Sequence, residues 1–68
     1  MSKFNTNTFG QRLGKLRQAA GLSVYRLAKA AGLSPQFVAA LEAGTKAPGW
    51  ETACKLAAAL EVSTEAFR

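Results

Sequence analysis

The basic side chains of the sequence are concentrated in its first 50 residues, and the chemistry that they favour is the binding of a polyanion. Residues 1–50 carry seven basic side chains and a single acidic one, Glu42, so this stretch has a net charge of +6, whereas residues 51–68 carry two basic and three acidic side chains. The seven basic residues are Lys3, Arg12, Lys15, Arg17, Arg26, Lys29 and Lys46. A basic body with a mildly acidic end favours a nucleic-acid partner, although a small domain can also be basic by chance.

Side chains suited to catalysis or metal binding are scarce. The chain has no histidine and one cysteine, Cys54, so it lacks the commonest general base, an internal disulfide and a zinc-ligand cluster. We therefore expect no enzyme activity, no metal site, no cofactor and no small-molecule substrate. No apolar run approaches the roughly 18 residues of a membrane span, and the N-terminus lacks a signal-peptide core, which favours a reduced, cytoplasmic protein without a membrane partner.

The apolar residues recur with helical spacing, so helices must position the basic side chains. In the first helix the expected inward stripe is Phe9, Leu13, Leu16 and Ala20, with Thr8 as the N-cap. Glycines and a proline-containing loop mark the helix ends, and no segment has the alternation of a strand. The sequence predicts an all-α fold of five helices after a flexible N-terminal tail at 1–7. The expected spans are 8–20, 24–31, 35–43, 50–60 and 64–67.

The second and third predicted helices have the pattern of a helix-turn-helix. Ala28 is small enough for the point where the two helices cross, and Gly32 tolerates the positive φ of a tight turn. Ser34 is an N-cap and Pro35 suits the first helical position. Each signal is weak alone, but their order is specific. The apolar contacts expected to hold the interhelical angle come from Leu27, Leu33, Val38 and Leu41.

The sequence over about residues 9–67 resembles the Cro/C1-type helix-turn-helix family, also called the XRE family. The resemblance implies a five-helix, lambda-repressor-like domain at 8–68 that binds double-stranded DNA, usually as a homodimer on a palindromic operator. The third helix would enter the major groove. The residues that carry the resemblance are Leu22, Ser23, Leu27, Ala28, Ala31, Gly32, Leu33, Ser34, Val38, Leu41, Glu42, Gly44, Pro48, Glu51, Thr52, Leu56, Ala57, Ala59, Leu60, Val62 and Ser63.

Base contacts would come from the exposed early positions of the third helix. The resemblance assigns them to Pro35, Gln36, Ala39 and Ala40. Gln36 is the one good hydrogen-bonding reader, suited to adenine N6 and N7, whereas the alanines offer only methyl contacts, for example to thymine. Most members of the family carry polar or basic groups here, so this chain departs from the pattern.

Phosphate contacts are expected around the ends of the same two helices. Lys46, in the loop after the third helix, is the foremost candidate. Val24 stands where the family often has a glutamine, but its backbone N–H at a helix N-terminus can still bind phosphate. Arg12 and Arg26, like Lys15 and Lys29, are alternatively solvated helix side chains. The full set of expected phosphate contacts is Ser23, Val24, Thr45, Lys46, Arg12 and Arg26.

Other positions are expected to be structural. Arg17 and Glu42 resemble an ion pair between the first and third helices, with a phosphate contact as the alternative for Arg17. Trp50 is expected in the core, at the start of the fourth helix, and Cys54 as a buried or half-buried filler. Phe67 is expected to cover the core, and a dimer face is its alternative.

The function that the sequence favours is sequence-specific DNA binding by a transcription regulator, a repressor associated with the nucleoid. The alternative is a protein-interaction module that keeps the fold but has lost DNA binding. The alanine-rich third helix supports this alternative because it exposes an apolar patch in place of hydrogen-bonding groups.

Overall fold

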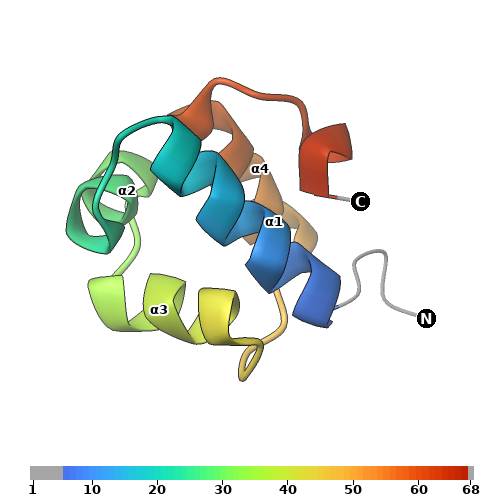
Figure 1. The fold of residues 1–68 in the computed structure, drawn as a ribbon. Helices are drawn as coiled ribbons and strands as arrows, with labels where there is room; N and C mark the ends of the chain where they lie inside the picture. The colour runs from blue at the N-terminus through green and yellow to red at the C-terminus, as the bar shows by residue number, and fades with distance from the viewer. Residues whose placement is uncertain (1–5, 68) are drawn as a thin grey trace.

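Four α-helices and one 3-10 helix make up the described chain. The computed structural model describes residues 6–67, with α1 (Thr6–Ala19), α2 (Val24–Ala31), α3 (Pro35–Ala43), α4 (Trp50–Leu60) and the 3-10 helix η1 (Thr64–Phe67) (Figure 1). These residues contain no strand, and none of their helices is long and apolar enough to cross a membrane. The predicted all-α class is correct. The count of five α-helices is wrong, because the last segment closes with an i→i+3 bond from Ala66 N–H to Ser63 O.

Local caps set most helix boundaries. The Ser23 and Ser34 hydroxyls accept the Arg26 and Phe37 N–H groups at 3.0 and 3.1 Å, and Gly32 ends α2 with φ of 73°. The first helix begins at Thr6, two residues before its predicted start, because neither added residue is a helix breaker. The predicted tail, residues 1–7, therefore overlaps α1 at its last two positions, and residues 1–5 lie outside the described chain.

The core lies between α1, α2, α3 and α4, and η1 closes it. The Phe67 ring packs against the Phe9 ring with centroids 4.7 Å apart, so η1 covers the core beside α1 and α4 (Figure 1). Cys54 is half-buried. The largest fully buried side chains are Phe9, Leu13, Leu27, Val38, Leu41, Leu56 and Phe67.

Two residues expected to face the core are exposed. Trp50 is 53% exposed, so its predicted burial is wrong. It is the first residue of α4, and the buried stripe of that helix begins three residues later with Ala53 and continues with Leu56. Ala20 is also exposed, because α1 ends at Ala19 and the stripe of that helix ends with it.

A glycine permits the closest approach between α1 and α3. A Cβ atom added to Gly10 would lie 2.4 Å from the Leu41 carbonyl oxygen and 2.7 Å from that of Glu42. Both contacts are with backbone, which cannot swing aside as a flexible side chain can. One turn later, a Cβ on Gly14 would meet only the Glu42 carboxylate, at 3.3 Å. Gly10 therefore determines how closely the last turn of α3 can pack on α1.

Candidate nucleic-acid interface

The helix-turn-helix unit consists of α2, a three-residue turn and α3. Gly32 adopts the left-handed conformation, and the next residue, Leu33, donates its N–H to the Ala28 carbonyl at 2.8 Å. Ala28 is fully buried where α2 packs against its neighbours, as a crossing point requires. Ser34 then caps α3, and Pro35 occupies its first turn. The turn thus directs α3 along one edge of the bundle, where one of its faces remains open (Figure 1).

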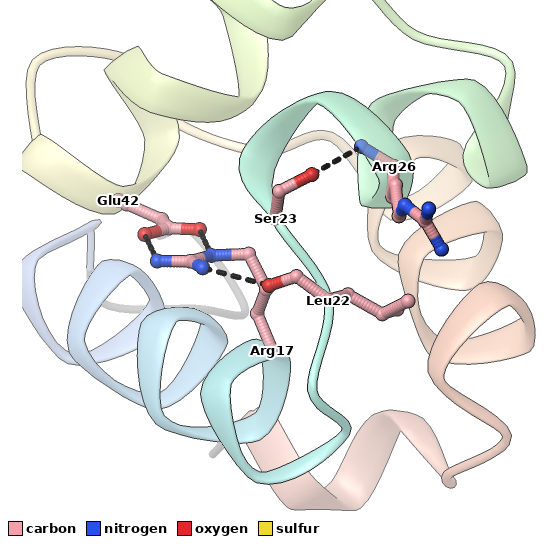
Figure 2. A network of polar contacts seen from close by, with 5 residues as sticks. All are labelled: Arg17, Leu22, Ser23, Arg26 and Glu42. Carbon is pink, nitrogen blue, oxygen red and sulfur yellow. Dashed lines mark hydrogen bonds and ion pairs between the residues drawn. The ribbon is translucent and has the colours of Figure 1, made fainter.

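Arg17 joins α1 to α3 and to the segment before α2. Its Nε and Nη2 donate to Glu42 Oε2 and Oε1 at 2.7 and 3.1 Å, and its Nη1 donates to the Leu22 carbonyl at 2.9 Å (Figure 2). The two charged side chains are only 15% and 16% exposed. The hydrogen bond to Glu42 raises the pKa of Arg17 above its ordinary value, against the opposing effect of desolvation. All three guanidinium nitrogens are engaged within the chain, which favours the structural role over a phosphate contact.

The open face of α3 is small and nearly uncharged. Gln36 and Ala39 are exposed, whereas Pro35 and Ala40 are half-buried. Ala43 is exposed as well, and sequence reasoning missed it. Its spacing could have revealed it, because positions 36, 39 and 43 follow i, i+3, i+7 and share one helix face. Phe37 is half-buried and packs against the core.

The candidate phosphate-binding residues lie on several elements. Lys46 is exposed in the loop after α3, and the neighbouring Thr45 donates its hydroxyl to the Ala40 carbonyl at 3.2 Å, which ties this loop to α3. Val24 is half-buried and packs on the core at the start of α2. Arg12 is exposed on α1.

The exposed face of α2 carries a second group of side chains. Arg26 extends away from the Arg17–Glu42 pair, although the Ser23 hydroxyl caps its backbone (Figure 2). Tyr25 is 62% exposed and lines a shallow depression with Arg26, Lys29 and Ala30. Sequence reasoning did not single out Tyr25, although its position two residues before the buried Leu27 places it about 200° away around the helix and indicated exposure. This face combines two cations with an aromatic ring.

Known proteins share both the sequence pattern and the fold. The profile of the helix-turn-helix domain family matches residues 8–68. The restriction-modification controller protein C.AhdI of Aeromonas hydrophila is 36% identical with a TM-score of 0.90, and the alignment covers 93% of this chain and 96% of that one.

Two further solved structures are similar. A transcriptional regulator of the HTH_3 family from Vibrio cholerae is 32% identical with a TM-score of 0.90, over 93% of this chain and 35% of the other. The clp gene regulator ClgR of Corynebacterium glutamicum is 26% identical with a TM-score of 0.89, over 97% and 86%. None of the curated proteins compared with the sequence matches it.

Proposed function

Because this chain belongs to the helix-turn-helix domain family and is of the Cro/C1 type, we propose that it is a transcription regulator that binds double-stranded DNA. The observation that carries the proposal is the α2–turn–α3 unit, in which α3 keeps one face open at the edge of the molecule. In this family architecture, α2 lies over the backbone and α3 enters the major groove.

The proposed DNA contacts are of two kinds, contacts to bases and contacts to phosphates. Base contacts fall to Pro35, Gln36, Ala39 and Ala40, and the Gln36 amide suits the donor and acceptor pair of adenine. Phosphate contacts hold the domain on the duplex without reading its sequence. For these we propose Lys46 and Thr45 after α3, the Ser23 and Val24 positions at the start of α2, and the exposed Arg12 and Arg26.

We further propose that the protein acts as a repressor and as a homodimer on a palindromic operator in the nucleoid. Occupation of an operator is enough to exclude other proteins from it, so repression needs no activity beyond binding. A two-fold axis relating two chains would match the symmetry of a palindrome. The names of the similar structures, a restriction-modification controller protein and a clp gene regulator, support a regulatory role.

A titration against a random-sequence duplex at several salt concentrations tests the proposal. Affinity should fall steeply as salt rises, since each phosphate contact releases a counterion. Lys46→Ala should weaken binding to all sequences about equally and make the log–log salt slope shallower by about 1. Lys55→Ala is the control, because Lys55 lies on α4 in an ion pair with Glu51 at 3.6 Å and should leave binding unchanged. An affinity that did not change with salt would instead favour the protein-interaction module.

A further inference from the structure

The open face of α3 presents almost nothing but methyl groups. Gln36, Ala39 and Ala43 are its exposed positions, and the helix has no acidic residue in its first turn and no basic residue in its last. Its one charged side chain, Glu42, is bound by Arg17. The Gln36 amide is therefore the only side-chain hydrogen-bonding group on this face, although the face belongs to the helix that the proposed function places in the major groove.

Ala39 and Gln36 cannot read the same base pair equally well. Three residues advance a helix by about 4.5 Å, and one base step is about 3.4 Å, so Ala39 lies roughly one base pair beyond the pair that Gln36 contacts. Ala43 lies farther along in the same direction. At these outer base pairs the protein offers a methyl group and no donor or acceptor. Contact between such a surface and an apolar group on the base stabilises the complex. The polar groups on the edge of the base have no side-chain partner here, so they do not affect binding.

We infer that α3 recognises the C5-methyl group of a pyrimidine, whichever pyrimidine carries it. At a base contacted by Ala39 or Ala43, 5-methylcytosine should therefore bind as well as thymine. The inference rests on the proposed function. Thymine presents O4 beside its methyl group and 5-methylcytosine presents N4–H₂, and only a polar side chain distinguishes the two. The substrate class is thus duplex DNA with a methylated pyrimidine one or more base steps from the adenine that Gln36 contacts.

Four versions of one duplex test the inference. The starting duplex is selected from a randomised library, and each thymine·adenine pair is replaced in turn by uracil·adenine, 5-methylcytosine·guanine or cytosine·guanine. At one or two positions uracil should weaken binding about fourfold, the value expected for one buried methyl group. At the same positions 5-methylcytosine should bind within about twofold of thymine, and cytosine should bind as weakly as uracil.

Variants assign the effect to α3. Ala39→Ser or Ala43→Ser should abolish the preference for the methylated base, since a hydroxyl replaces the apolar contact, while Ala58→Ser, the same change at an exposed position of α4, should keep it. The inference is overturned if uracil is tolerated at every thymine, or if 5-methylcytosine binds as weakly as cytosine. In either case steep salt dependence would leave the proposed function intact. Loss of salt-dependent binding to every duplex would overturn both.

Discussion

Gln36 is the residue on the open face of α3 that can form side-chain hydrogen bonds with a base. Gln36→Ala should lower the discrimination between the preferred base pair and its alternatives by roughly 1–3 kcal/mol, because one bidentate contact to a base is lost. Binding to random DNA should change little, since phosphate contacts remain. Selection from randomised duplexes measures the preference, with Gln18→Ala on the exposed surface of α1 as the control. An unchanged preferred sequence in Gln36→Ala would show that another group reads the DNA.

Glu61 is the only described non-glycine residue with a positive φ. It follows α4 with φ of 58° and ψ of 41°, and its N–H donates to the Ala58 carbonyl at 3.2 Å. A left-handed conformation costs an L-residue about 1–2 kcal/mol, and glycine avoids this cost. Glycine also has more conformational freedom in the unfolded chain, which offsets about half of the gain in stability. Glu61→Gly should therefore raise the free energy of unfolding by about 1 kcal/mol.

Thermal denaturation of the Glu61 variant checks this expectation. Its Tm should rise by roughly 4–8 °C for a domain of this size. Ala58→Gly, an exposed substitution inside α4, should instead lose about 1 kcal/mol, because glycine is a poor helix former. A Tm for Glu61→Gly at or below that of the parent chain would refute the assigned strain.

At the scale of elements, the contact of α1 with α3 sets the position of the proposed recognition helix. Gly10→Ala should destabilise the domain by about 2–3 kcal/mol or more, since the methyl group meets two carbonyl oxygens of the α3 backbone. Gly14→Ala should stay within about 1 kcal/mol of the parent, because the neighbouring Glu42 carboxylate can move and alanine favours the helix. Urea denaturation of the two variants measures the difference. Equal stabilities would show that the α1–α3 contact is not tight.

The Arg17–Glu42 ion pair also holds α1 and α3 together, through hydrogen bonds between side chains. Arg17 reaches the last turn of α3 and also the Leu22 carbonyl before α2, so one side chain connects both helices of the helix-turn-helix to α1. A partly buried pair with two parallel hydrogen bonds determines orientation more than it adds stability. Gly10 limits how near α3 lies to α1, and the ion pair limits how α3 turns about that contact.

For the whole molecule, the fold separates the charges that the sequence carries in different halves. The exposed Lys46 follows α3 directly, while the exposed Glu61 and Glu65 lie at the end of α4 and in η1, on the other side of α1 (Figure 1). A polyanion approaching the α3 side therefore meets Lys46 near the proposed reading surface and stays away from Glu61 and Glu65.

One α3 has a single polar reader, so specific binding should require two chains. A palindromic duplex with half-sites about 34–36 Å apart should bind two chains cooperatively. A duplex with one half-site should bind much more weakly, because the contacts are halved. Sedimentation of the complexes gives the stoichiometry, and a duplex with 5 additional base pairs between the half-sites is the control that turns one site to the opposite face. Equal affinity for one half-site and for the palindrome would contradict the dimer.

Local sequence alone determined the helices and their class. The predicted spans of α2 and α3 agree with the structure because the Ser23 and Ser34 caps, Pro35 and the glycines that end both helices act within about four residues of themselves. The span of α4 agrees as well, although that helix has no side-chain cap and ends at Glu61 instead of a glycine. The helix-turn-helix could be predicted for the same reason. The Arg17–Glu42 pair could not come from local pattern, and its prediction depended on the family resemblance.

Only the tertiary structure decided which side chains are open to a partner and which contacts limit the packing. Trp50 is apolar and begins a helix, yet its side chain is 53% exposed, whereas Ala53 and Leu56 of the same helix are fully buried. Gly10 looks like any helical glycine until the α3 carbonyls are placed beside it. Exposure and close approach are properties of segments far apart in sequence, so periodicity within one helix cannot determine them.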